Sequence, residues 1–137
     1  MSQSYDYVIV GGGVAGASAA QTLRAEGAKG SILLLAAEPQ LPYHRGSLSK
    51  TFLSSASAES VRWILDAAGY EKLGIEVRLG AAVTSVQPSR HRLCVGAKDE
   101  LVFGQLLIAT GASAQQLEIP GAGLAGIHTL PCSSNLR

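Results

Sequence analysis

Apolar residues in this chain form short continuous runs that are interrupted by glycine-rich breaks. The first run is residues 7–10 (Tyr-Val-Ile-Val), and the second is residues 31–36 (Ser-Ile-Leu-Leu-Leu-Ala). Runs without a polar face are typical of strands that are covered on both sides. Residues 14–26, between the two runs, are mostly good helix formers, and Gly27 follows where such a helix should stop. The pattern predicts a parallel βαβ unit with a right-handed crossover.

The pattern becomes less regular after the second run. Residues 37–60 are rich in Pro, Ser and Gly, and we expect a single helical turn over residues 48–53. Long irregular segments in a compact domain usually carry function. The later elements are expected as a helix over 61–73 with Trp63 packed on its face, a strand over 75–79, antiparallel strands over 82–86 and 92–95, and a buried parallel strand over 105–109.

Composition narrows the class of protein. The 137 residues suffice for one domain with its own hydrophobic core. A hydrophobic fraction of 47% with only 15% charged residues fits a sheet that is covered on both faces, and it argues against disorder. The chain has eleven basic and ten acidic residues, so its net charge is too small to attract nucleic acid or an anionic membrane. We therefore expect neither as a partner.

Cysteines and histidines give no sign of a metal or disulfide framework. Cys94 and Cys132 each lack a CxxC partner, which is typical of free thiols in a reducing compartment. The three histidines are scattered and have no carboxylate at ligand spacing, so we expect no metal site. The polar N-terminus leads into an apolar run that glycines break before it reaches the length of a signal peptide. These features favour a soluble, cytoplasmic protein.

Three glycines connect the first predicted strand to the predicted helix. Gly11, Gly13 and Gly16 have the GxGxxG spacing, and their place between strand and helix is typical of dinucleotide-binding folds. Gly11 permits the tight turn, Gly13 lets backbone approach a pyrophosphate, and Gly16 lets the helix pack close to the strand. The phosphates would meet the N–H groups of Val14, Ala15 and Gly16 at the positive end of the helix. We predict an α/β fold of the FAD/NAD(P)-binding type, with a Rossmann-like parallel sheet and a small antiparallel β excursion.

The end of the second predicted strand bears on the ribose. A dinucleotide fold normally places an acidic side chain there to hold the adenosine hydroxyls. Ala36 and Ala37 occupy that end in this chain, and Glu38 follows one step later. Glu38 is therefore the candidate ribose ligand, while a solvated loop carboxylate is the alternative, and the sequence leaves both open.

The next segment carries a more specific pattern. Residues 39–50 read PQLPYHRGSLSK, and this resembles the signature of the FAD-dependent ferredoxin reductases, which serve rubredoxin, putidaredoxin and ring-hydroxylating oxygenases and include apoptosis-inducing factor. Residues 106–112 (LLIATGA), 119–121 (IPG) and 126–128 (GIH) are similar to the segment by which that family leaves its first FAD-binding half for its NADH domain. The resemblance covers most of the chain and points to the ferredoxin reductase branch of the FAD-dependent pyridine nucleotide-disulfide oxidoreductase superfamily.

The resemblance implies FAD as the bound cofactor, NADH as the electron donor and a ferredoxin-like iron-sulfur protein as the acceptor. The arginine that matches Arg45 reaches the FAD phosphate and ribose. The lysine that matches Lys50 lies beside the flavin ring, where a cation stabilises the reduced flavin. Val83 matches a position whose backbone meets the adenine, with simple strand packing as the alternative. The turn near the dinucleotide is matched by Ala109, Thr110 and Gly111. Because the cofactor supplies the chemistry, the sequence nominates no catalytic acid or base.

Three features depart from this family. Gly46 and Ser47 stand where it has Pro-Pro, so the loop that presents Lys50 loses two fixed φ angles. The second-strand acid falls on Ala37, which removes a charge-assisted hydrogen bond of about 1.5 to 3 kcal/mol unless Glu38 substitutes. The family continues into an NADH domain, a second FAD-binding segment and a C-terminal interface domain, so residues 1–137 correspond to a partial FAD-binding domain.

The sequence thus favours an FAD-binding, NADH-dependent oxidoreductase of the ferredoxin reductase type, or a fragment of one. The alternative is a truncated, non-catalytic dinucleotide-binding module, which an end at Arg137 would favour. A fragment of an NAD-dependent dehydrogenase would share the glycines but leaves the motif over residues 42–50 unexplained. Disulfide chemistry is disfavoured, because residues 37–58 lack the CxxxxC pair of the thiol-disulfide members of the superfamily.

Overall fold

The computed structural model describes residues 3–47, 61–113, 115 and 118–127. The chain divides into two compact units. The first comprises Met1–Tyr43 and Trp63–Thr110, and the second comprises His44–Arg62 and Gly111–Arg137. All strands and both α-helices of the described residues belong to the first unit, whereas the second contributes one 3-10 turn, η1 (Arg45–Ser47). The helical turn expected over residues 48–53 and the position of Lys50 lie outside the described residues.

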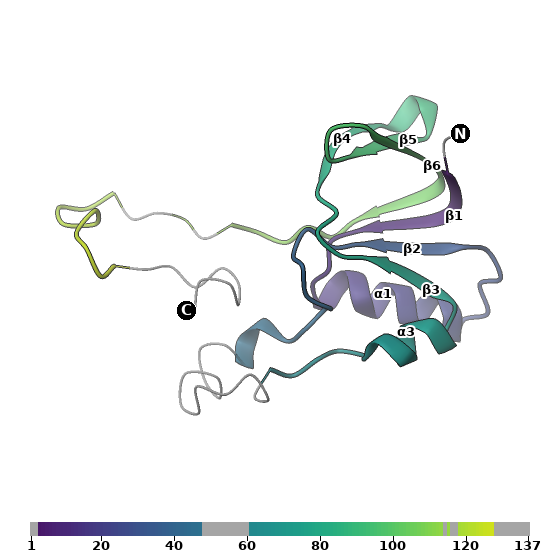
Figure 1. Cartoon of the computed structure of the whole chain (residues 1–137), viewed down its shortest axis with the longest axis horizontal. Helices are drawn as coiled ribbons and strands as arrows, with labels where there is room; N and C mark the ends of the chain where they lie inside the picture. Colours follow the sequence, from purple (N-terminus) through teal and green to yellow (C-terminus); the bar gives the residue numbers. More distant parts are fainter. Residues whose placement is uncertain (1–2, 48–60, 114, 116–117, 128–137) are drawn as a thin grey trace. The chain divides into compact units, whose positions relative to one another are not determined.

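A six-stranded sheet with the order β3-β2-β1-β6-β5-β4 forms the centre of the first unit (Figure 1). Neighbours from β3 to β6 pair in parallel, and β6-β5-β4 pair antiparallel. The predicted Rossmann-like sheet with a small antiparallel excursion is confirmed. The strands are β1 (Gln3–Val10), β2 (Ile32–Leu35), β3 (Ile75–Arg78), β4 (Val83–Gln87), β5 (Arg92–Val95) and β6 (Asp99–Ile108), and the helices are α1 (Val14–Ala25) and α3 (Ala67–Lys72), with a 3-10 turn η4 (Pro88–Arg90) between β4 and β5.

Two hydrophobic clusters cover opposite faces of this sheet. Figure 1 shows α1 and α3 on one side of β1, β2 and β3, and the ribbon of β4 and β5 turned away from them. All four residues of β2 are buried, because Ile32 and Leu34 pack on the helix side while Leu33 and Leu35 pack on the other side. Burial of such a side chain contributes about 1.5 to 3 kcal/mol. This two-sided burial explains the continuous apolar run in the sequence.

The end of α1 is fixed by a single arginine. Gly27 follows the helix with φ +86°, a left-handed conformation that glycine adopts without strain. The Arg24 guanidinium donates hydrogen bonds to four backbone oxygens at 2.6 to 2.8 Å. Two of them precede β2 and two precede β3, namely those of Ala28, Gly30, Leu73 and Gly74. Arg24 therefore ties the helix to both neighbouring strands.

The expected helix over residues 61–73 is wrong in its first half. Trp63 pairs with Tyr43 in an isolated antiparallel bridge, and the helix α3 begins only at Ala67. The Asp66 carboxylate caps it by accepting a hydrogen bond from the Gly69 N–H at 2.8 Å. Trp63 lies outside this helix and is 46% exposed, and its ring contacts that of Tyr43. The tertiary bridge thus overrides the helix propensity of this segment.

The last strand also differs from the expectation. The strand predicted over residues 105–109 begins earlier than expected, because β6 runs without a break from Asp99 to Ile108. Its first half pairs with β5 and nearly all of it pairs with β1. Its last residues are not buried, since Leu107 is 42% and Ile108 is 60% exposed. Among the described residues, this end of β6 has a neighbouring strand on its β1 side only.

In the part of the chain that the structure describes, no helix has both the length and the apolar character that a bilayer crossing requires.

Candidate dinucleotide-binding site

The glycine-rich turn lies at the carboxyl edge of the parallel strands. Gly11 has φ +124°, and its N–H donates a hydrogen bond to the Leu35 oxygen at 2.8 Å. A Cβ at Gly11 would lie 2.1 Å from the Ala109 oxygen. Ala109 is itself held by a 2.7 Å hydrogen bond from its N–H to the Val10 oxygen. The turn is therefore packed between the ends of β2 and β6, and only glycine fits at position 11.

Two further glycines keep the backbone of this turn close to its surroundings. A Cβ at Gly16 would lie 2.0 Å from the Gly11 oxygen and 3.3 Å from the Ile9 side chain. A Cβ at Gly12 would lie 2.5 Å from the Ala36 Cβ. Gly16 thus provides the close approach of helix and strand that the sequence predicted, and Gly12 brings the turn against the end of β2.

The N-terminal end of α1, Gly13 to Gly16, is called the mouth of α1. Its first residue, Gly13, lies in open space, in contrast to Gly11 and Gly12 before it. Gly13 is the N-cap residue, and a Cβ there would meet no atom within 4 Å. No side chain of the described residues caps the helix, and its first turn contains no acidic residue. Val14 and Ala15, which follow, are exposed. The first amides of a helix lack partners within the helix and carry its positive dipole end. Among the described residues, this mouth has the form of an anion site for a diphosphate.

Glu38 is half-buried in the loop that follows β2. Its backbone oxygen accepts a hydrogen bond from the Gly80 N–H at 3.0 Å, and the Ala36 oxygen accepts one from the Ala81 N–H at 2.8 Å. The Glu38 carboxylate accepts a hydrogen bond from the hydroxyl of Tyr43 at 2.8 Å. Sequence reasoning named Glu38 but missed Tyr43 as its partner. Their spacing of five residues within an irregular segment gives no periodic signal that could have shown the pair.

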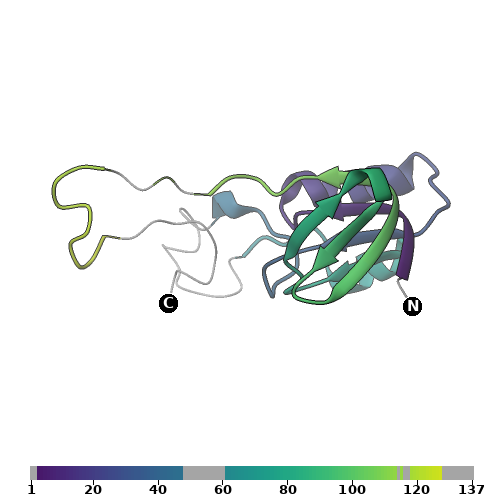
Figure 2. The same cartoon turned by 90° about the horizontal axis from the view of Figure 1, so that it is seen from above.

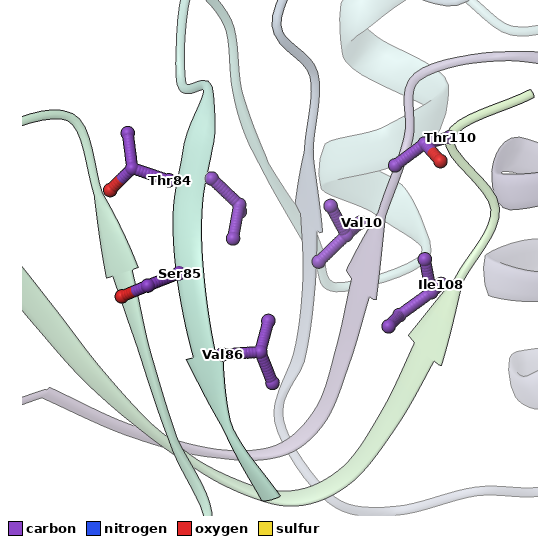
Figure 3. A pocket seen from close by; sticks show the side chains of 7 residues that line it. Val10, Thr84, Ser85, Val86, Ile108 and Thr110 are labelled. Atoms are coloured by element: carbon purple, nitrogen blue, oxygen red, sulfur yellow. The ribbon is translucent and has the colours of Figure 1, made fainter. Parts of the chain in front are cut away.

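A hollow of about 290 Å³ lies at the ends of β1 and β6, on the face of the sheet opposite to α1. Figure 3 shows Val10, Ile108 and Thr110 on one side of it and Val86 of β4 on the other, while Ser85 points away from Val86 across the strand. The hollow is lined by Val10, Val83, Thr84, Ser85, Val86, Ile108 and Thr110. The Val83 side chain also packs against the core on this side of the sheet, and the contact of its backbone with the adenine stays a prediction.

The three remaining candidates lie outside the first unit. Arg45 is the first residue of η1, in the second unit, and its side chain is exposed. Gly111 has φ +73° and is the first residue of the second unit after β6. Lys50 lies outside the described residues. The roles of these three residues stay predictions.

No group of three or more His, Cys, Asp or Glu side chains that could hold a metal ion occurs within residues 3–47, 61–113, 115 and 118–127. Cys94 is a free, half-buried thiol on β5.

Comparison with known proteins places this arrangement among flavoprotein reductases. The chain is 41% identical over 122 residues to the ferredoxin–NAD(+) reductase component of the biphenyl dioxygenase system of Paraburkholderia xenovorans, with 89% of this chain and 30% of that protein covered. It is 38% identical over 133 residues to the rubredoxin-NAD(+) reductase of Pseudomonas putida, with 95% of this chain and 34% of that protein covered. The chain thus spans about a third of the length of these relatives.

Solved structures show the same relation. A ferredoxin reductase from Rhodopseudomonas palustris superposes with a TM-score of 0.86 at 28% identity, over 95% of this chain and 32% of that one. Putidaredoxin reductase, in its covalent complex with putidaredoxin, superposes with a TM-score of 0.77 at 32% identity, over 83% of this chain and 27% of that one. The family model for pyridine nucleotide-disulphide oxidoreductases matches residues 5–135, so the chain belongs to this family.

Proposed function

We propose that this chain is the FAD-binding portion of an NADH-dependent reductase of the ferredoxin reductase type. The observation that carries the proposal is the open mouth of α1, where a Cβ at Gly13 would meet no atom within 4 Å. Among the described residues, no side chain caps the helix, and its first turn contains no acidic residue. A nucleotide diphosphate is the kind of anion that such a helix end binds. The similarity to ferredoxin and rubredoxin reductases favours FAD over a nicotinamide dinucleotide at this position.

The residues of the first unit suit the two ends of the dinucleotide's adenosine diphosphate half. Gly11, Gly13 and the amides of Val14, Ala15 and Gly16 would hold the pyrophosphate. Glu38, three residues beyond the end of β2, would accept hydrogen bonds from the ribose hydroxyls. Val83 would lie at the adenine. By the resemblance, Arg45 would reach the FAD phosphate and ribose, and Lys50 would lie beside the flavin ring. Ala109, Thr110 and Gly111 would form the turn near the dinucleotide.

Bound FAD would supply the redox chemistry, taking up reducing equivalents from NADH and releasing electrons to a ferredoxin-like iron-sulfur protein. The protein's own contribution is to bind, orient and tune the cofactor, so we assign no acid or base. Because NADH and reduced iron-sulfur proteins belong to the reducing interior of the cell, we expect a cytoplasmic location without nucleic-acid or membrane partners.

A dinucleotide-binding module without catalysis is the second candidate. The exposed end of β6 favours it, because Leu107 and Ile108 leave apolar sheet surface uncovered among the described residues. Such a module would hold the adenosine end of FAD but would not organise a productive flavin site.

Visible absorbance of the purified chain, followed by titration with FAD and then NADH, tests the proposal. We expect stoichiometric flavin binding, and bleaching of the flavin by NADH if the chain forms a productive reductase. Weak flavin binding without bleaching would favour the non-catalytic module. Binding of NAD without FAD would contradict the proposal and favour a dehydrogenase fragment.

We expect Lys50→Met to lower the reduction potential of the bound flavin, because the substitution removes a cation that favours the reduced, anionic form. One charge at 4 Å contributes about 1 to 4 kcal/mol at effective dielectric constants between water and a protein surface, which is roughly 20 to 90 mV for a two-electron couple. The potential is read by equilibration with a redox dye. Lys98→Met, on the turn before β6, is the matched control, and an equal potential in all three proteins would count against a role for Lys50.

A further inference from the structure

The tyrosine of the PQLPYHRGSLSK segment is built into the first unit of the fold. Tyr43 is only 4% exposed, and its ring meets Trp63 edge-on, with centroids 6.2 Å apart and an interplanar angle of 83°. Tyr43 and Trp63 also form an isolated β-bridge, and the neighbouring Pro42 oxygen accepts a hydrogen bond from the Ile64 N–H at 2.9 Å. Ring packing and backbone pairing therefore fix the direction of the Tyr43 hydroxyl.

That hydroxyl is directed at one carboxylate. Tyr43 donates a 2.8 Å hydrogen bond to Oε2 of Glu38. The backbone of Glu38 is held independently through the Gly80 N–H, and Ala36 lies against the glycine-rich turn at Gly12. The backbone that carries the carboxylate is thus fixed just after β2. The charge-assisted hydrogen bond from the buried Tyr43 sets the orientation of the carboxylate.

An orienting partner matters here because the carboxylate is displaced along the chain. Ala37 lies two residues beyond the end of β2, at the position where a dinucleotide fold normally has its ribose-binding acid. Glu38 is one residue further, in a loop, and its long side chain loses rotamer freedom when it binds. A carboxylate accepts about four hydrogen bonds, so a bond from Tyr43 is compatible with further bonds from ribose hydroxyls.

We infer that Tyr43 is a positioning residue that holds the Glu38 carboxylate toward the ribose hydroxyls of a bound adenine nucleotide. The inference rests on the proposed function, since it requires that the adenosine diphosphate half of FAD binds at the mouth of α1. It gives the tyrosine of this segment a role in recognition of the ribose and not only in packing of the loop.

The test compares ADP with 2′,3′-dideoxy-ADP, which lacks the two hydroxyls, by calorimetric titration of the full chain. The unmodified chain should bind ADP roughly tenfold more tightly than the dideoxy nucleotide, as expected for hydrogen bonds to a charged group. Tyr43→Phe should reduce this preference to about two- to threefold by weakening ADP alone. Glu38→Gln should have a similar effect, and the double variant should lose little more, because the two residues act through one contact.

Tyr70→Phe is the matched control. Tyr70 is also buried, but its hydroxyl has no hydrogen-bond partner among the described residues, and burial raises the pKa of Tyr70 to about 12. This control should leave the preference for ADP unchanged. If Tyr43→Phe does not fold, Glu38→Asp serves instead, because its shorter carboxylate cannot reach both the tyrosine and the ribose, and it should also reduce the preference.

Equal weakening of both nucleotides by Tyr43→Phe would show a purely structural tyrosine and overturn the inference. An unchanged preference in Tyr43→Phe, or in Glu38→Asp where that variant serves, would overturn it as well. In either case ADP binding by the unmodified chain would leave the proposed function standing. Absence of ADP and FAD binding by the unmodified chain would instead reject the proposed function, and the inference with it.

Discussion

Gly11→Ala should destabilise the fold by about 2 to 5 kcal/mol, and Gly16→Ala by about 1 to 3 kcal/mol or more. At Gly11 the alanine would be forced into a left-handed conformation, which costs about 1 to 2 kcal/mol, and its Cβ would lie 2.1 Å from the Ala109 oxygen. At Gly16 the Cβ would lie 2.0 Å from the Gly11 oxygen. Both contacts involve backbone, which cannot rotate aside as a side chain would, and overpacking commonly costs 1 to 3 kcal/mol or more.

Such losses are large against the roughly 5 to 15 kcal/mol that stabilises a natural domain. Urea unfolding followed by circular dichroism measures them as a shift of the midpoint. Gly123→Ala is the matched control, because a Cβ there meets nothing within 4 Å and the residue is not in the left-handed region. A change below about 1 kcal/mol in Gly11→Ala and Gly16→Ala would mean that the packing of the turn described above is wrong.

Gly13→Ala should have the opposite profile: an intact fold and a weakened site. A Cβ at Gly13 meets no protein atom, and the residue has φ −85° and ψ −176°, an extended conformation that alanine adopts freely. At an N-cap, alanine is less favourable than glycine by a few tenths of a kcal/mol to about 1 kcal/mol. The same methyl group would occupy the space through which a pyrophosphate approaches the helix amides, so we expect FAD affinity to fall at least about tenfold.

The three alanine substitutions therefore separate structure from binding with one chemical change. Thermal unfolding of Gly13→Ala should match the unmodified chain within a few degrees, while titration with FAD shows the loss. Unchanged FAD affinity together with an unchanged fold would show that phosphate does not pass over Gly13, and the position of the nucleotide in the proposed site would have to be abandoned.

Much of the parallel half of the sheet could be predicted from the sequence because local and tertiary preferences agree there. The residues of β2 are all buried, two on each face of the sheet, and a continuous apolar run is the pattern that predicts such a strand. Gly11 and Gly16 are required because backbone atoms around the turn between β1 and α1 lie too close for a side chain. The GxGxxG spacing alone predicted both glycines. The helix α1 begins at Val14 as the position of the glycines predicts.

The errors fall where long-range contacts decide. Residues 61–66 are not helical because Trp63 pairs with Tyr43, a contact that no local pattern reveals. The pattern indicated a strand only from residue 105, but β6 begins at Asp99 because β1 and β5 pair with it along different parts of its length. The hydrogen bond between Tyr43 and Glu38 was missed for the same reason, since it depends on how an irregular segment folds back on itself.

Calorimetric titration of the unmodified chain with ADP shows whether the amides at the mouth of α1 receive a nucleotide diphosphate. We expect saturable binding of one ADP per chain, which FAD competes for and which Gly13→Ala weakens. A folded chain that releases no heat with ADP and does not respond to FAD would contradict this expectation.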